Sequence, residues 1–251
     1  MIKNSRIAVI IPIYNEEDTL NHLFYRIDGV YKMLKDDYNI KFIFINDGSN
    51  DRSGEILDDR YKNSQYAKIV HHDRNSGYGA GLKTGFDIAL GDGFQYIMTI
   101  DADTNYDQFL VPKFIYDFNP ETEDIMAASP WHPECSKRNF PFIRFVLSSS
   151  MSKLYQFVLS PECPPLTCYS ACFRLYKREV IENIKHESNG FLTNTEIISQ
   201  ALLRGYRVRE VPVNVNYRLF GISKMRTIPQ IFKHLKYMRF LLKNKNNLRG
   251  G

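Results

Sequence analysis

The feature that most constrains the fold is a regular alternation of short apolar runs and helical patterns over the first hundred residues. The apolar runs cover residues 6–13, 40–45, 67–70 and 96–100. Helical patterns begin after the first three runs, near Glu16, Asp51 and Gly79. Such alternation is typical of βαβ units, whose strands lie parallel in one sheet. The sequence therefore predicts an α/β fold with a Rossmann-like, mostly parallel central sheet flanked by helices.

The composition is that of a globular chain rather than a fibrous, disordered or membrane-spanning one. Hydrophobic residues make up 43% and charged residues 24% of the 251 positions. Purely apolar stretches such as Ile7–Ile11 are far shorter than the roughly 18 residues that a membrane-spanning helix needs. The N-terminus shows no apolar run followed by a small-residue cleavage site, so we expect no signal peptide and a cytoplasmic location.

Charge is distributed unevenly along the chain. Glu210 is the last acidic residue, and nine of the 33 Lys and Arg residues follow it. The preceding part is mildly acidic, because its 24 basic residues are outnumbered by 28 Asp and Glu residues. Apolar residues between 228 and 242 recur at helical spacing among the lysines and arginines. This pattern predicts a basic amphipathic C-terminal helix, which either lies on an anionic membrane surface or docks on the core with its lysines in solvent.

Polar side chains follow the predicted strands, at the edge of the sheet where α/β proteins bind ligands. Asp101 and Asp103 come directly after the fourth apolar run, and Asn105 lies just beyond. Carboxylate and amide oxygens are the ligands that Mg²⁺ and Mn²⁺ prefer, and these ions commonly bind substrate phosphates. The residues therefore predict a metal site, with a solvated turn as the alternative.

Two further motifs allow more than one interpretation. Asp47 ends the second apolar run, and its carboxylate could accept a hydrogen bond from a nucleobase. A turn followed by a helix cap explains the neighbouring Gly48, Ser49 and Asp51. The glycine-rich stretch 77–85 fits neither the dinucleotide-binding nor the P-loop spacing. It predicts either a helix N-terminus that receives an anion or close packing of a helix on the sheet.

The alternating pattern stops between about residues 130 and 165, where proline-rich loops surround an amphipathic segment. This predicts a lid or a helical insertion. Within it, Arg144 and Ser148 lie one helical turn apart, which suits either a phosphate or a solvated helix face. Arg218 and Lys224 flank a glycine and a serine near the basic tail. The four cysteines contain no C-x-x-C pair, so we expect buried free thiols.

Four motifs, taken in order, resemble the family 2 glycosyltransferases with the GT-A fold. They are VIIPIYNEE at 9–17, NDGSND at 46–51, NSGYGAG at 75–81 and DAD at 101–103. The resemblance covers about residues 6–225. Two later segments, FRLYKR at 173–178 and RLFGISK at 218–224, are similar to the dolichyl-phosphate mannose synthase branch, the polyprenyl-phosphate glycosyltransferases.

This resemblance implies a division of the chain and an activity. Residues 1–225 would form the GT-A domain, with an insertion at about 130–165, and residues 226–251 a basic amphipathic helix and tail. The enzyme would be a metal-dependent, inverting hexosyltransferase. It would transfer a sugar from a GDP- or UDP-sugar to a polyprenyl phosphate, such as dolichyl or undecaprenyl phosphate. It would associate peripherally with the cytoplasmic face of a membrane through the C-terminal helix.

The resemblance also implies roles for individual residues. The catalytic residues would be Asp101, Asp103, Arg218 and Lys224. The ligands of Mg²⁺ or Mn²⁺ would be Asp101, Asp103 and Asn105. The nucleotide-sugar site would contain Pro12, Tyr14, Glu16, Asp47, Asn75, Lys83, Asp101, Ala102 and Asp103. The acceptor phosphate would meet Arg144, Ser148, Arg218 and Lys224. Two segments depart from the branch: Ala128–Pro133 replaces a Gly-Ser-Arg-Tyr pattern, and Ser170–Arg174 replaces Thr-Ser-Gly-Phe-Arg.

The chemistry of the acceptor separates two enzyme hypotheses. A hydroxyl acceptor needs a carboxylate base, whereas a lipid monophosphate arrives already ionised. The predicted acceptor helix offers Glu196 but no Glu-Asp pair, which favours the phosphate. The alternative is an inverting transferase that acts on a saccharide or protein hydroxyl, with Glu196 as the base. We expect no nucleic-acid partner, because the basic tail has few aromatic residues arranged for base stacking and the body is acidic.

Overall fold

The computed structural model describes residues 2–103, 106–135, 142–159, 163–215 and 227–249. The strands are β1 (Arg6–Ile13), β2 (Asn39–Asn46), β3 (Ala67–His71), β4 (Tyr96–Thr99), β5 (Ile125–Ser129), β6 (Arg174–Lys177) and β7 (Val208–Pro212). The helices are α1 (Glu17–Leu34), α2 (Ser53–Tyr61), α3 (Tyr78–Gly91), α4 (Leu110–Asp117), α5 (Phe142–Leu159), α6 (Arg178–Asn183), α7 (Leu192–Leu203) and α8 (Thr227–Arg249).

The strands form one seven-stranded sheet in the order β3-β2-β1-β4-β6-β5-β7. Strands β3, β2, β1 and β4 run parallel, as the βαβ alternation predicts. Strand β6 inserts antiparallel between β4 and β5, and β7 pairs parallel with β5. The predicted mostly parallel α/β sheet is therefore confirmed. We call β3-β2-β1-β4 with α1–α3 the parallel half, and β6-β5-β7 with α5–α8 the mixed half.

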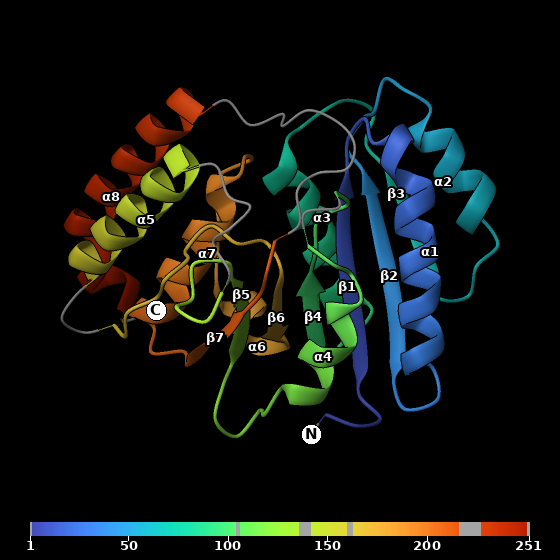
Figure 1. Cartoon of the computed structure of the whole chain (residues 1–251), viewed down its shortest axis with the longest axis horizontal. Helices are drawn as coiled ribbons and strands as arrows, with labels where there is room; N and C mark the ends of the chain where they lie inside the picture. Colours follow the sequence, from blue (N-terminus) through green and yellow to red (C-terminus); the bar gives the residue numbers. More distant parts are fainter. Residues whose placement is uncertain (1, 104–105, 136–141, 160–162, 216–226, 250–251) are drawn as a thin grey trace.

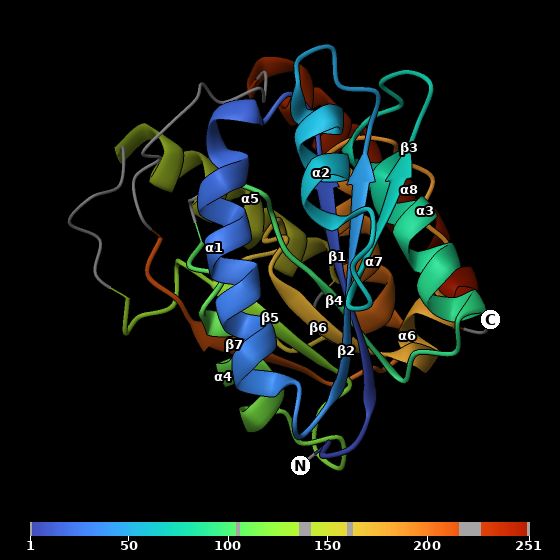
Figure 2. The same cartoon turned by 90° about the vertical axis from the view of Figure 1, so that its right-hand side faces the viewer.

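Helices cover both faces of the sheet (Figures 1 and 2). In β1, Ile7, Val9 and Ile11 pack into a core with α1, α2 and α4, while Ala8 and Ile10 pack into a second core with α3, α7 and α8. Successive side chains of a strand point to opposite faces, so a strand buried on both sides reads as a continuous apolar run. This is why the first strand is so apparent in the sequence.

Ion pairs between buried carboxylates and partly exposed basic side chains stabilise the outer edge of the mixed half. Arg207 donates hydrogen bonds to Asp124, which also accepts one from Lys177 at 2.7 Å. Arg209 on β7 pairs with Glu123 in the same way. These carboxylates precede β5 and the basic partners flank or lie in β6 and β7, so the pairs join three strands that are distant in sequence. Among the described residues, no helix is both long and apolar enough to cross a membrane.

The two amphipathic helices differ in detail from the predicted stripes. In α5, Val158 of the stripe Ile143, Leu147, Met151, Leu154 and Val158 is buried, but Leu154 is exposed and the buried line runs through Tyr155 and Leu159. In α8, Met238 of the stripe Ile228, Ile231, Phe232, Leu235, Met238 and Leu242 is buried, together with Tyr237 and Leu241. Phe232, Leu235 and Leu242 are exposed. The C-terminal helix thus docks on the core and still presents apolar side chains to solvent.

Candidate active site

The candidate site lies at the carboxyl ends of β1, β2 and β4, where chain segments far apart in sequence meet (Figure 1). Strand β1 lies between the other two, and Thr99 of β4 is level with Ile10 of β1. Pro12 and Asp101 each follow this residue pair by two positions, so they lie beside each other at the ends of the two strands. The register brings the DAD motif beside the first of the four motifs, VIIPIYNEE at 9–17, as the sequence predicts for parallel strands.

The loops after β1 and β2 hold each other through short polar side chains. The backbone N–H of Asn15 donates to the hydroxyl of Ser49 at 3.0 Å, and the N–H of Asn50 donates to Asn15 Oδ1 at 2.8 Å. The N–H of Glu16 donates to the hydroxyl of Ser53 at 2.8 Å. Asn15 has a φ of 51°, in the left-handed region that asparagine tolerates better than most residues. The N-E-E and N-D-G-S-N-D motifs therefore form one interlocked wall, which also carries Tyr14.

Asp47 is almost fully buried, at 3% exposure, and the chain itself binds its carboxylate. It accepts hydrogen bonds from the backbone N–H groups of Ser76 and Gly77 at 2.9 and 2.8 Å. His72 Nδ1 lies 2.8 Å from the same carboxylate, and His72 Nε2 lies 2.9 Å from the hydroxyl of Thr84. Asp47 thus fixes the loop before α3 against β2. Its assignment to the nucleotide pocket stays a prediction.

Glycines allow this loop and α3 to approach the sheet closely. Gly48 has a φ of 63°, and a Cβ there would lie 2.2 Å from the backbone of Arg74. A Cβ on Gly85 would lie 2.4 Å from Ile10, so α3 packs tightly on β1. The close-packing interpretation of the glycine-rich stretch is confirmed. The N–H of Gly79, in the first turn of α3, donates to the carbonyl of Asn189 at 2.8 Å. Asn75 and Lys83 are exposed on this loop and helix.

Asp101 and Asp103 lie in a turn whose backbone is held in place. Gln108 Nε2 donates to the carbonyl oxygens of Asp101 and Asp103 at 3.2 and 3.0 Å. The thiol of Cys172 donates to Asp101 Oδ2 at 2.5 Å. Burial, then Asp101 and Asp103, raise the pKa of Cys172 well above its ordinary value. The fields of both carboxylates thus converge on one small region, where Ala102 is also buried.

The donor atoms of this turn suit a hard divalent cation. Asp101 and Asp103 are separated by one residue, and a cation would relieve the electrostatic cost of two neighbouring carboxylates. Within the described ranges, no group of three His, Cys, Asp or Glu side chains is arranged to hold a metal ion. The third predicted ligand, Asn105, lies outside those ranges. The two aspartates therefore fit a Mg²⁺ or Mn²⁺ ion that takes its other ligands from substrate phosphates and water.

The predicted acceptor residues are only partly within the described structure. Ser148 on α5 accepts a hydrogen bond from the indole N–H of Trp131 at 2.8 Å, and the Trp131 ring packs against Phe145. This bond ties α5 to the segment after β5, near the end of the sheet. Arg218, Lys224 and the side chain of Arg144 lie outside the described residues, so their assignments stay predictions.

Glu196, the alternative base, is buried in α7 and faces away from open solvent. Its Oε2 accepts hydrogen bonds from the backbone N–H groups of Glu187 and Ser188 at 3.1 and 2.9 Å. Burial raises its pKa, which the two backbone bonds oppose. Asn194, half a turn earlier, donates to the phenol of Tyr78 at 3.4 Å. Burial and then Asp101 raise the pKa of Tyr78, so this phenol lies within electrostatic range of the DAD motif. Its hydrogen-bond partner on α7 is the Asn194 amide.

Sequence reasoning missed Gln108, Cys172 and Tyr78 as parts of this site. Gln108 follows the DAD motif at a spacing that matches no sequence rule. Cys172 lies 71 residues after Asp101, so only the tertiary structure brings these two residues together. Tyr78 lies inside a noticed glycine-rich motif, but its contact with α7 depends on tertiary structure. All four cysteines are buried and free, as predicted.

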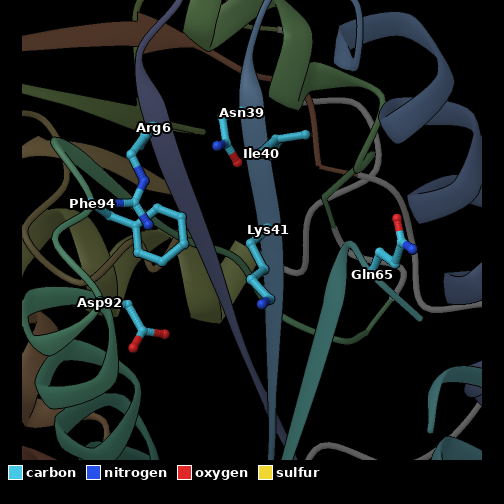
Figure 3. A pocket seen from close by; sticks show the side chains of 7 residues that line it. All are labelled: Arg6, Asn39, Ile40, Lys41, Gln65, Asp92 and Phe94. Carbon is cyan, nitrogen blue, oxygen red and sulfur yellow. The ribbon is translucent and has the colours of Figure 1, made fainter. Parts of the chain in front are cut away.

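A separate hollow of about 430 Å³ lies at the amino ends of β1 and β2, the opposite end of the sheet (Figure 3). The Arg6 guanidinium stacks over the Phe94 ring there, and Lys41 and Asp92 also line the hollow. Asp92 pairs with Lys68 at 3.3 Å. Because ligands of open α/β sheets bind at the carboxyl ends of the strands, we do not assign the substrate to this hollow.

Comparison with known proteins agrees with this geometry. The family model described as glycosyl transferase family 2 matches residues 8–185. The chain therefore belongs to glycosyl transferase family 2, and it is a glycosyltransferase. The residues that match the family model run from β1 through β6 and include the interlocked wall and the DAD turn.

Two curated relatives cover most of this chain. Polyprenol monophosphomannose synthase of Mycolicibacterium smegmatis is 28% identical over 224 residues, which are 88% of this chain and 81% of the relative. Dolichol-phosphate mannosyltransferase of Pyrococcus furiosus is 28% identical over 241 residues, 95% of this chain. The chain spans only 64% of that second protein.

Among solved structures, glucosyl-3-phosphoglycerate synthase of Mycobacterium tuberculosis has a similar fold. Its complex with phosphoglyceric acid gives a TM-score of 0.66 at 15% identity, over 96% of this chain and 80% of that one. Its complex with Mn²⁺, uridine diphosphate and glucosyl-3-phosphoglycerate gives a TM-score of 0.64 over 98% of this chain and 80% of that one. This likeness confirms the GT-A type of fold.

Proposed function

We propose that this glycosyltransferase transfers a sugar from a GDP- or UDP-sugar to a polyprenyl phosphate, with inversion at the anomeric carbon. The observation that carries the proposal is the state of the acceptor helix α7. Its carboxylate, Glu196, accepts hydrogen bonds from two backbone N–H groups, and the α7 side chain that donates to the Tyr78 hydroxyl is the amide of Asn194. A phosphate acceptor needs no base, because its second pKa is near 6. The names of the two curated relatives support the same acceptor class.

The residues of the site supply the parts of such a reaction. Asp101 and Asp103, with Asn105, would hold Mg²⁺ or Mn²⁺, and the ion would neutralise charge that develops on the departing nucleoside diphosphate. The wall formed by the loops after β1 and β2 would position the nucleotide through Pro12, Tyr14 and Glu16. Arg218 and Lys224 would bind the acceptor phosphate on the face opposite the leaving group. An attack from that face inverts the anomeric carbon.

The acceptor class also predicts contact with a membrane, for which α5 and α8 provide a surface. Neither helix contains an acidic residue. The two helices contact each other, and a hydrogen bond of 2.9 Å joins the Tyr155 hydroxyl of α5 and His234 Nδ1 of α8. The exposed side chains are both apolar and basic: Val146, Lys153, Leu154 and Phe157 on α5, and Phe232, Leu235, Lys236, Arg239, Leu242 and Lys243 on α8. We call these residues the α5/α8 surface.

Apolar and basic side chains together suit an anionic lipid surface. The apolar groups enter the interface between headgroups and acyl chains, and each basic group near the surface adds roughly 1 kcal/mol of attraction. Phe157 and Phe232 are 80% and 68% exposed, so their burial in lipid would gain most of their apolar transfer energy. We therefore propose that the enzyme associates peripherally with the cytoplasmic face of a membrane.

The test is release of nucleoside diphosphate from a panel of GDP- and UDP-sugars with Mn²⁺ or Mg²⁺, with and without a polyprenyl phosphate in detergent. We expect release from one donor, stimulated by the lipid. Release that is indifferent to the lipid, but stimulated by a saccharide, would replace this acceptor with the hydroxyl acceptor. No release from any donor would contradict the proposed donor class.

A further inference from the structure

Cys172, which lies just before β6, contacts the Asp101 carboxylate. Its Sγ lies 2.5 Å from Asp101 Oδ2, and the two residues are 71 positions apart in the sequence. Cys172 is 5% exposed. Gln108 fixes the backbone of the same turn, whereas Cys172 contacts the carboxylate itself. The thiol therefore acts on the orientation of the group that would bind the cation.

The backbone of Cys172 is held firmly against β4. Its carbonyl oxygen accepts a hydrogen bond from the hydroxyl of Thr99 at 2.5 Å, and Thr99 is opposite Arg174 in the antiparallel β4–β6 ladder. Asp101 follows Thr99 by two residues. The thiol and the carboxylate thus extend from two strands that are paired with each other, which leaves little freedom in their relative position.

The residues after Cys172 anchor this segment in the core. Phe173 and Arg174 have no exposed surface. The Arg174 guanidinium donates to the carbonyl of Tyr169 at 2.7 Å and to the carbonyl of Asn194 at 2.5 Å. These bonds join the segment before β6 to α7. A side chain on so rigid a segment can preorganise its partner, because no loop has to be ordered when the ligand binds.

We propose that Cys172 is a positioning residue, whose thiol holds Asp101 in the orientation that binds the divalent cation. A cysteine thiol can donate one hydrogen bond. The contact with Oδ2 fixes the direction in which the Asp101 carboxylate points. Outer groups that orient metal ligands commonly contribute 10–100-fold to metal affinity. This inference rests on the metal site of the proposed function and adds a residue to it.

The experiment measures Mn²⁺ binding to the full chain without substrate, from the electron paramagnetic resonance signal of free Mn²⁺. Cys172→Ala removes the donor, and Cys172→Ser keeps a hydroxyl donor at the same position. We expect Cys172→Ala to raise the Kd for Mn²⁺ by about tenfold, the lower end of the range, because a thiol is a weak donor. Cys172→Ser should stay within about threefold of the unmodified chain.

Cys135→Ala is the matched control. Cys135 is also buried, but its thiol donates to the backbone carbonyl of Ser129 at 3.3 Å and contacts no aspartate. We expect its Kd for Mn²⁺ to be unchanged. If Cys172→Ala does not fold, as judged by circular dichroism, Cys172→Val replaces it, because valine has a similar volume and no donor.

A second measurement separates positioning from catalysis. The Mn²⁺ concentration that gives half-maximal turnover should rise by the same factor in Cys172→Ala, with kcat at saturating Mn²⁺ nearly unchanged. Equal Kd values in Cys172→Ala and the unmodified chain would overturn the inference and leave the metal site standing. Equal losses in Cys172→Ala and Cys172→Ser would also overturn it, since packing rather than donation would then be responsible. Failure of the unmodified chain to bind Mn²⁺ would overturn the metal site as well.

Discussion

The two halves of the sheet are held together by different means. In the parallel half, side chains at strand ends bind backbone N–H groups of the neighbouring loop, as Asp47 does with Ser76 and Gly77. In the mixed half, ion pairs to buried carboxylates, such as Arg207–Asp124, join the strands, and α5 and α8 leave apolar side chains exposed. The parallel half is thus a closed, preorganised wall, whereas the mixed half has an open outer surface. The difference suits a small polar donor on one side and a lipid on the other.

The prediction with the largest expected effect tests whether the reaction takes place at the end of β4, where the two halves of the sheet meet. We expect Asp103→Asn to lower kcat by about a thousandfold, because the substitution removes one charged metal ligand and nearly preserves side-chain shape. Nucleoside diphosphate release at saturating donor measures it. Asp92→Asn, at the opposite end of the sheet, is the control and should retain full turnover. Full activity in Asp103→Asn would remove the metal assignment.

The next prediction tests the rigidity of the parallel half. We expect Asp47→Ala to lower the free energy of unfolding by about 3 kcal/mol, because two backbone N–H groups and the ring of His72 lose their buried acceptor. Urea unfolding followed by circular dichroism measures the loss. Asp58→Ala is the control, since the Asp58 side chain is half exposed and pairs with His71 at the surface. Equal stability of both variants would show that the wall does not depend on this carboxylate.

The sequence predicted the parallel half well because its information is local. The apolar runs of β1, β2 and β4 are largely buried on both faces, and polar residues follow each strand within a few positions. Strands and site edge could therefore both be located. The partners of Asp47 could not be predicted, because they depend on how α3 approaches β2. The same limit applies to the insertion of β6 between β4 and β5, which places Cys172 beside Asp101. No periodicity encodes a contact between residues 71 positions apart.

In the mixed half, the helical spacing predicted α5 and α8 but not which side chains they bury. Leu154 and Val158 belong to one predicted stripe, yet only Val158 is buried, because the helix meets α7 and α8 along the line through Tyr155. The position of a neighbouring helix decides which edge of an apolar stripe is covered. Sequence alone therefore left open whether α8 docks on the core or faces a membrane.

Acidification should weaken the mixed half more than the parallel half. Burial lowers the pKa of His234, between α5 and α8, to about 4. The same histidine in the unfolded chain has a pKa near 6.5. The unfolded chain therefore binds the proton first, and stability that is present above pH 6.5 is lost as the pH falls toward 4.

We expect this histidine to account for about 3 kcal/mol of the stability lost between pH 7 and pH 4. Urea unfolding at several pH values should show a smaller loss in His234→Gln than in the unmodified chain. The glutamine keeps a polar partner for Tyr155 and carries no titrating proton. Parallel pH profiles for the two chains would show that α8 docking is indifferent to this histidine.

The smallest expected effect tests whether the open surface of the mixed half meets lipid. Removing the Phe157 ring forfeits about 1.4 kcal/mol of apolar transfer, since an interface buries only part of the side chain. We therefore expect Phe157→Ser to weaken binding to vesicles that contain anionic lipid by about tenfold, measured by co-sedimentation. Met33→Ser, at an exposed position on α1 of the parallel half, should bind as the unmodified chain does. Turnover with detergent-solubilised polyprenyl phosphate should be the same in both variants, because neither residue lies at the site. Equal vesicle binding by both variants would show that Phe157 of the α5/α8 surface does not contribute to membrane binding. The exposed surface of the mixed half would then have no part in reaching a lipid acceptor.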